Sequence, residues 1–146
     1  MKVWLQGVLV AVVLLLTGCG QQQWLDHKGA GLTPDDLQGK WVVVNYWAEW
    51  CAPCLQELPE FNQLAADRSD MLVLGVNYDG VSGDALVELA ERMGITFSVM
   101  GDDFAQSMKL ERPQVLPTTY IFNPQGELLY SLSGPQTRSG LLELIK

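Results

Sequence analysis

Two nearly continuous apolar runs, rich in β-branched and aromatic residues, dominate the middle of the chain. They extend from Trp41 to Trp47 and from Met71 to Val76. Such runs are typical of strands buried on both faces, which occur in parallel sheets with helices on either side. The segment between them, from Cys54 to Ala66, has apolar residues at helical spacing. This strand–helix–strand order predicts a right-handed βαβ unit.

Shorter elements follow on both sides of this unit, separated by turn residues. In chain order we predict a capped turn at 32–37, a helix at 84–93, an extended piece at 95–100, a weaker helix at 103–110, a hairpin of strands 118–122 and 127–132, and a helix at 141–145. At 146 residues, the chain has the length of one ordinary domain with additional terminal segments.

The first 18 residues have the pattern of an export signal. Lys2 precedes an apolar run of 14 residues, Val3 to Leu16, which suits a signal peptide and is short for a membrane span. The run ends in the sequence LTGC at 16–19, which resembles the lipobox of bacterial lipoproteins. That resemblance implies that residues 1–18 are removed and that Cys19 is lipidated. An uncleaved N-terminal anchor is the alternative.

Residues 19–31 are polar and punctuated by glycine, without periodicity, and this pattern predicts a tether between the membrane and a domain at 32–146. His27, the only histidine, lies in this segment and is expected to be solvated. The export signal places the domain on the periplasmic side. The absence of Asp at position 20 leaves the choice between the inner and outer membrane open.

Composition narrows the possible partners. The chain is 48% hydrophobic and 18% charged, as globular proteins are. Its net charge is −8, and the basic residues form no cluster. Binding of nucleic acid through phosphate neutralisation is therefore excluded as a function class.

Cys51 and Cys54 are the candidate reactive residues of the chain, because they lie between the end of the first apolar strand and the start of the helix. A thiol at a helix N-terminus is favoured as its thiolate, which is the form that attacks a disulfide. Pro53 suits the first turn of a helix. If Cys19 is lipidated, these two cysteines form an even pair. A CxxC ring closes too short a loop to act mainly as a structural staple.

Three motifs in this order resemble those of the TlpA/ResA-type membrane-tethered thiol-disulfide oxidoreductases. They are NYWAEWCAPC at 45–54, CLQELP at 54–59 and LPTTY at 116–120. The resemblance implies the thioredoxin fold, an α/β architecture with a central mixed sheet flanked by helices. It also implies that Cys51 and Cys54 form a redox-active disulfide, that Pro117 follows a cis peptide bond, and that Leu116 pairs with substrate backbone.

Glu57 is the third candidate catalytic residue. It shares one helical face with Cys54, Phe61 and Leu64, so a carboxylate falls on the apolar stripe. Burial there would raise its pKa and make it a usable proton acceptor. By resemblance, Glu57 replaces the buried strand acid of cytoplasmic thioredoxins, where this chain has Asn45. The alternative is a carboxylate at the edge of the stripe that reaches water.

The two tryptophans of the motif have different expected places. We predict that Trp47 belongs to the core. Trp50 is predicted to lie on the exposed rim beside the thiol, where it would touch substrate.

The expected activity is reduction of protein disulfides, with Cys51 attacking and Cys54 resolving. The dipeptide Ala52-Pro53 lacks the histidine of strongly oxidising relatives, which favours a reductant. By resemblance, the electrons come from a membrane thiol donor, and no cofactor other than the disulfide is expected. Three alternatives stay open: a copper-handling protein, which would lack a histidine after His27; a thiol peroxidase; and a structural lipoprotein of the same fold.

Overall fold

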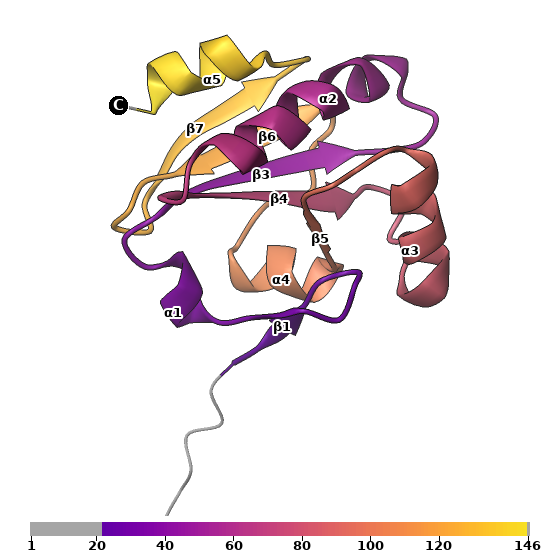
Figure 1. The fold of residues 1–146 in the computed structure, drawn as a ribbon, viewed down its shortest axis with the longest axis horizontal. Coiled ribbons are helices and arrows are strands. Elements are labelled where there is room, and N and C mark those ends of the chain that lie inside the picture. The colour runs from indigo at the N-terminus through magenta and orange to yellow at the C-terminus, as the bar shows by residue number, and fades with distance from the viewer. Residues whose placement is uncertain (1–21, 146) are drawn as a thin grey trace, which may run out of the picture.

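The computed structural model describes residues 22–145, and the export signal and Cys19 lie outside this range. Within it, five strands form a mixed sheet in the order β5-β4-β3-β6-β7 (Figure 1). The strands are β3 (Trp41–Trp47), β4 (Met71–Asn77), β5 (Ser98–Met100), β6 (Thr118–Phe122) and β7 (Leu128–Ser133). β3 is parallel to β4 and antiparallel to β6. The two apolar runs are therefore adjacent central strands, as predicted.

Helices cover both faces of the sheet. They are α1 (Pro34–Leu37), α2 (Ala52–Asp67), α3 (Gly83–Arg92), α4 (Asp102–Ser107) and α5 (Arg138–Leu144). Figure 1 shows α2 and α5 on one side and α1 and α4 on the other. α1 lies in the capped turn predicted at 32–37, with Thr33 at the N-cap and Pro34 in the first turn. α5 starts three residues earlier than its apolar pattern indicated, because Thr137 caps it by accepting the Gly140 N–H.

Alternation along the central strands divides the core into two clusters. On β3, Val43 and Trp47 face α2, α3 and α5, whereas Val42, Val44 and Tyr46 face the opposite layer. Trp47 has no exposed surface, which confirms its predicted place in the core. Because both faces of β3 are buried, its sequence shows a continuous apolar run rather than strict alternation.

The folded domain begins earlier than the predicted boundary at residue 32. β1 (Trp24–Leu25) and β2 (Gly31–Leu32) pair as a small antiparallel sheet. Trp24 is only 4% exposed and packs edge-on against Phe104 of α4, with 5.3 Å between ring centroids. The predicted tether is thus shortened at its C-terminal end. A two-residue strand carries no periodicity, so the pattern could not reveal this contact.

His27 also differs from its predicted solvated state. Its backbone N–H donates to the Val99 carbonyl at 2.8 Å, and its Nδ1 accepts the Val99 N–H at 3.1 Å. Partial burial lowers the pKa of the imidazole, and the Asp26 carboxylate partly opposes this effect. His27 therefore fastens the N-terminal segment to the edge strand β5.

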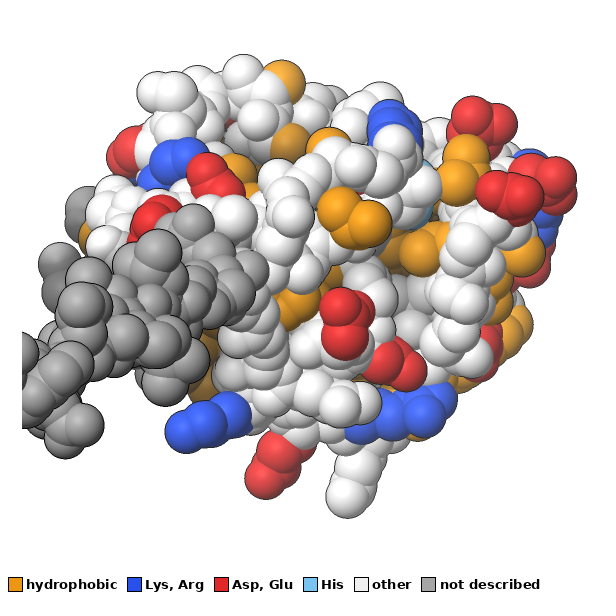
Figure 2. All heavy atoms as spheres, turned by 90° about the horizontal axis from the view of Figure 1, so that it is seen from below, with side chains coloured by type: hydrophobic (Ala, Val, Ile, Leu, Met, Phe, Trp, Pro, Cys, Tyr) orange, Lys and Arg blue, Asp and Glu red, His pale blue; other side chains and the backbone are white. Residues whose placement is uncertain are grey.

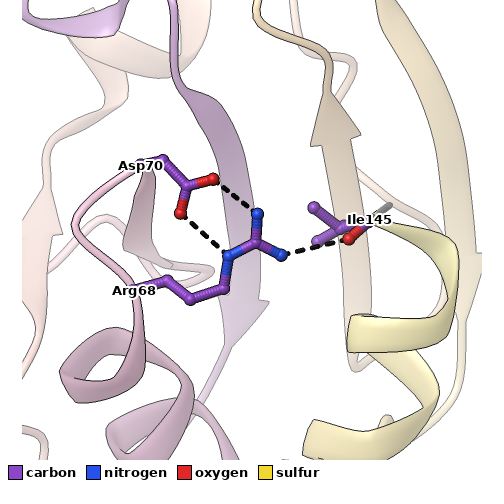
Figure 3. A network of polar contacts seen from close by, with 3 residues as sticks. All are labelled: Arg68, Asp70 and Ile145. Carbon is purple, nitrogen blue, oxygen red and sulfur yellow. Dashed lines mark hydrogen bonds and ion pairs between the residues drawn. The ribbon is translucent and has the colours of Figure 1, made fainter.

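The C-terminal helix is tied to the start of β4 by one arginine (Figure 3). The Arg68 guanidinium binds both carboxylate oxygens of Asp70 and donates to the Ile145 carbonyl at 3.1 Å. Arg138, at the other end of α5, forms an ion pair with Asp67 of α2. These two arginines hold α5 along α2. The position of α5 matters for the active site because the loop before α5 contacts Glu57.

On the face seen in Figure 2, charged side chains lie among uncharged ones. The Lys and Arg side chains on this face form no continuous basic area. Between residues 22 and 145, no helix has both the length and the apolar character needed to cross a membrane.

Candidate active site

Four loops meet at one end of the sheet, and the strand directions explain why. β3 and β4 are parallel, so the segments after Trp47 and after Asn77 leave from the same edge. β6 is antiparallel to β3, so the segment before Thr118 arrives at that edge, and β7 ends beside it, since Ser133 pairs with Thr118. The topology therefore gathers residues 48–51, 78–82, 111–117 and 134–137.

The first of these loops carries the dithiol. Cys51 is the N-cap of α2 and is joined to Cys54 by a disulfide. The Cys54 N–H donates to the Cys51 sulfur at 3.3 Å. In the reduced protein, this N–H and the positive end of the helix would stabilise a Cys51 thiolate. Cys51 is 4% exposed and Cys54 is completely buried, so the small accessible surface of the disulfide belongs to Cys51.

Glu57 lies on the buried face of α2 with Cys54, Phe61 and Leu64, as its spacing predicted. Its side chain is 1% exposed, so it does not extend into water. One carboxylate oxygen, Oε1, accepts the Asn45 side-chain N–H at 2.7 Å. The other, Oε2, accepts the backbone N–H of Gln136 at 2.8 Å. Two hydrogen bonds, one from β3 and one from the loop before α5, fix the carboxyl group.

Burial raises the pKa of Glu57 to about 7, because the desolvated carboxylate is less stable than the acid. The hydrogen bonds from Gln136 and Asn45 oppose this rise without cancelling it. The group can therefore take up or release a proton near neutral pH, as a general acid or base must.

This raised pKa predicts that the oxidised protein is less stable in alkaline than in acidic solution. The folded protein binds the Glu57 proton more tightly than the unfolded chain does, because the pKa of this carboxyl group is near 4.5 when it is solvated. The free energy of unfolding should therefore fall as the pH rises from about 4.5 to about 7, with a contribution on the order of 3 kcal/mol. Urea denaturation at pH 5 and pH 8 measures this difference. Glu57→Gln should reduce it, and an unchanged difference would contradict the assignment.

The peptide bond between Leu116 and Pro117 is cis, as the family resemblance implied. β6 starts at the next residue, and Tyr46 pairs with Thr118, so the register continues with Pro117 beside the end of β3. The Thr118 hydroxyl donates to the Val115 carbonyl at 2.7 Å and fixes the loop. Leu116 is half-buried and packs against the core cluster that contains both cysteines, whereas the preceding Val115 is 55% exposed.

Trp50 occupies the exposed rim predicted for it. Its side chain is 64% exposed although it immediately precedes Cys51. The indole N–H donates to the carboxylate of Asp79, at 2.9 and 3.2 Å to the two oxygens. The ring meets Tyr78 edge-on, with 6.0 Å between centroids. The loop after β4 therefore holds an exposed aromatic side chain beside the attacking cysteine.

Comparison with known proteins agrees with this geometry. The profile of the AhpC/TSA family matches residues 20–131. The chain is 32% identical over 126 residues to the thiol-disulfide oxidoreductase ResA of Geobacillus kaustophilus, and the match covers 83% of this chain and 72% of the relative. The chain belongs to the ResA-type thiol-disulfide oxidoreductases.

Other relatives support the same family. ResA of Bacillus subtilis is 33% identical over 116 residues, covering 78% of this chain and 64% of that protein. Among solved structures, StoA of Bacillus subtilis superposes with a TM-score of 0.68 at 25% identity, covering 84% of this chain and 93% of StoA. The predicted thioredoxin-like fold and the predicted thiol-disulfide oxidoreductase activity are thereby confirmed.

Several residues at the active site of this ResA-type protein were not indicated by the sequence. They supply the surroundings of Glu57 and Trp50: Asn77, Tyr78, Asp79, Arg112 and Gln136. Asn77 shapes the loop after β4, because its side-chain oxygen accepts the N–H groups of Asp79 and Val81. The Asp79-Gly80 pair is a turn signal that marks this loop. No sequence signal relates Gln136 to Glu57, 79 positions away.

The copper-handling alternative predicted a ligand set that includes histidine. Among residues 22–145, no group of three or more His, Cys, Asp or Glu side chains could hold a metal ion. His27 lies at β5, with its ring bound to the Val99 backbone.

Proposed function

We propose that this protein is a reductant of disulfides in proteins of the bacterial envelope. The observation that carries the proposal is a disulfide at the N-terminus of α2 with a fully buried carboxylate on the same helix, three residues after Cys54. The first group exchanges electrons with a substrate disulfide, and the second can accept a proton near pH 7. No cofactor beyond the disulfide itself enters the reaction.

The reaction proceeds in two exchange steps. In the reduced protein, the Cys51 thiolate attacks one sulfur of the substrate disulfide, and the other substrate sulfur leaves as a thiolate that takes a proton from water. Cys54 then transfers its proton to the Glu57 carboxylate and attacks the Cys51 sulfur. The second substrate thiolate is released, and the Cys51–Cys54 disulfide forms. Two electrons pass from the protein dithiol to the substrate.

Asn45 and Gln136 give Glu57 its orientation for this transfer. Both partners donate to the carboxyl group and neither is charged, so they position it without driving it to permanent ionisation. Leu116 and Pro117 would align an extended substrate segment beside Cys51, and Trp50 would contact its side chains.

The intervening dipeptide determines the expected direction of electron flow. Ala52-Pro53 supplies no positive charge to stabilise the reduced thiolate, so the reduction potential is expected nearer thioredoxin's roughly −270 mV than the roughly −120 mV of a strong oxidant. A membrane thiol donor would return electrons to the protein after each turnover.

The test is reduction of insulin disulfides, combined with the equilibrium potential against glutathione. We expect catalysed reduction and a potential below about −220 mV, which is the oxidising end of the cytosolic glutathione poise. Oxidation of reduced substrates with a potential near −120 mV would reverse the proposed direction.

Faster consumption of hydrogen peroxide than of disulfides would favour the peroxidase, and tight binding in a copper titration would favour metal handling. A protein inactive in all of these assays would be the structural lipoprotein.

We also propose that Cys19 anchors the protein to the membrane as a lipoprotein, facing the periplasm. The lipobox-like sequence at 16–19 supports this proposal. The full-length protein should fractionate with membranes, because several acyl chains bind stably. Replacing Cys19 and exchanging the signal for a cleavable one without a lipid site should release it as a soluble periplasmic protein. Unmodified protein found free in the cytoplasm would refute the anchor.

A further inference from the structure

Two of the loops around the disulfide are joined by a single arginine. Arg112 belongs to the segment 111–117, which ends in the cis Leu116–Pro117 bond. Its guanidinium carbon lies 4.1 Å from the centroid of the Tyr78 ring, in the loop after β4. One of its terminal N–H groups donates to the Tyr78 backbone carbonyl. Arg112 therefore binds both the ring and the backbone of Tyr78.

Tyr78 carries this contact to the rim of the active site. Its backbone N–H donates to the Trp47 carbonyl at 2.8 Å, so the residue is fixed on both sides. Its ring meets Trp50 edge-on, and the next residue, Asp79, accepts the Trp50 indole N–H. Arg112, Tyr78 and Trp50 form a continuous row, which we call the rim row.

The charge of Arg112 is used differently from that of the other arginines. Arg68, Arg92 and Arg138 each form an ion pair with a carboxylate. Among the arginines of residues 22–145, Arg112 is the one without such a pair, and the face of an aromatic ring takes that place. A cation above a tyrosine ring is attracted by the negative face of the ring, and the bond to the carbonyl adds direction. The contact thus restrains Tyr78 rather than neutralising a charge.

Each of the two segments that this row connects exposes an apolar side chain. Trp50, which immediately precedes Cys51, is 64% exposed, and Val115, 55% exposed, lies on the loop that carries Arg112. An exposed tryptophan without contacts would sample several rotamers, and a substrate would have to order it on binding. A tryptophan already fixed on Tyr78 and Asp79 avoids that loss of freedom.

We propose that Arg112 is a positioning residue for substrate recognition, which acts through Tyr78 to hold Trp50 at a fixed place beside Cys51 and relative to the loop that carries Val115 and Leu116. The preferred substrates are protein disulfides with apolar residues next to the attacked cysteine, since those residues would lie against Trp50 and Val115. This inference rests on the proposed function and specifies the substrate class of the same site.

The test compares two disulfide-bonded peptides of the same length, one with Leu and Val and the other with Ser flanking the cysteine. Wild-type protein should reduce the apolar peptide with the lower KM. Arg112→Gln should raise that KM about five- to tenfold, with little change in kcat, and should affect the serine peptide much less. Arg112→Lys keeps a cation and a donor, so it should restore most of the preference. Lys109→Gln, which removes a charge from the same region without a contact to Tyr78, is the control and should leave the preference unchanged.

A second measurement reports the position of Trp50 directly. Acrylamide quenching of Trp50 is obtained as the difference between each protein and its Trp50→Phe counterpart. It should increase in Arg112→Gln and return towards wild type in Arg112→Lys. Circular dichroism and thermal unfolding would establish that the variants are folded.

The outcomes separate this inference from the proposed function. If wild-type protein reduces both peptides but Arg112→Gln alters neither the preference nor the quenching, the positioning role is wrong. An equal rise in KM for both peptides would also refute it, because it would show a general loss of binding. If wild-type protein reduces neither peptide nor the neutral hydroxyethyl disulfide, the reductase function fails, and the substrate class fails with it.

Discussion

A Cys54→Ala variant is expected to accumulate as a mixed disulfide with its substrates and to lose catalytic turnover. Cys51 keeps its place at the N-cap of α2, where the helix end stabilises its thiolate, so attack should continue. Cys54 is the buried sulfur that would displace the substrate from Cys51. Without Cys54, only an external thiol can resolve the adduct, and the reaction stops at the mixed disulfide.

The adduct can be measured by non-reducing electrophoresis and mass spectrometry of the variant isolated from cells. The matched control is Cys51→Ala, which retains one thiol of the pair but lacks the attacking one and should capture no partners. Equal capture by the two variants would show that Cys54 also attacks, and greater capture by Cys51→Ala would reverse the assignment of roles. The captured proteins would at the same time identify the physiological substrates.

Glu57→Gln is expected to slow resolution of the mixed disulfide by roughly 10²-fold, the lower range for loss of general-base help. Glutamine has nearly the same shape and can still accept a hydrogen bond from Asn45 or Gln136, so the fold should persist. It cannot take the proton from Cys54. In wild-type protein, resolution should become faster as the pH rises through about 7, because Glu57 must be ionised to accept a proton. In the variant, this rise should disappear.

Glu60→Gln is a closely matched control for this experiment. Glu60 is half-buried rather than fully solvated, and it accepts the Arg138 backbone N–H at 2.8 Å. It therefore anchors the first residue of α5, two residues after Gln136, but Glu60 lies about one helical turn further along α2 from Cys54. Stopped-flow measurement of attack and resolution across pH would compare the two variants. Indistinguishable resolution rates and pH profiles would exclude Glu57 as the proton acceptor.

The sequence predicts the parts of the active site that depend on spacing within one element. Glu57 lies three residues after Cys54 on a helix whose apolar stripe is clear, so its place on that stripe follows from periodicity, whereas the structure was needed to show that it is buried and does not reach water. The central strands were predictable for a similar reason, because burial on both faces of β3 leaves a continuous apolar run. The cis bond before Pro117 was available only through the family resemblance, since nothing in the local composition distinguishes it.

Contacts between distant segments could not be predicted in the same way. The partners of the Glu57 carboxylate come from β3 and from the loop before α5. The ring beneath Arg112 belongs to a residue 34 positions earlier. Trp24 was assigned to a tether because its neighbours are polar, yet one aromatic side chain is sufficient to attach a short segment to α4. Such contacts are selected by the completed fold and leave no local pattern.

The hydrogen bond from Gln136 to Glu57 has a consequence for the order in which the protein acquires activity. Synthesis proceeds from the N-terminus, so the two cysteines emerge about 80 residues before the Gln136 N–H group that binds Glu57. During this interval the thiols can already react with other disulfides, whereas the Glu57 carboxylate still lacks its hydrogen bond from Gln136. A nascent chain is thus able to form a mixed disulfide before the residues proposed to resolve it are all in place. Such early adducts would persist until the segment that carries Gln136 has been synthesised and has folded.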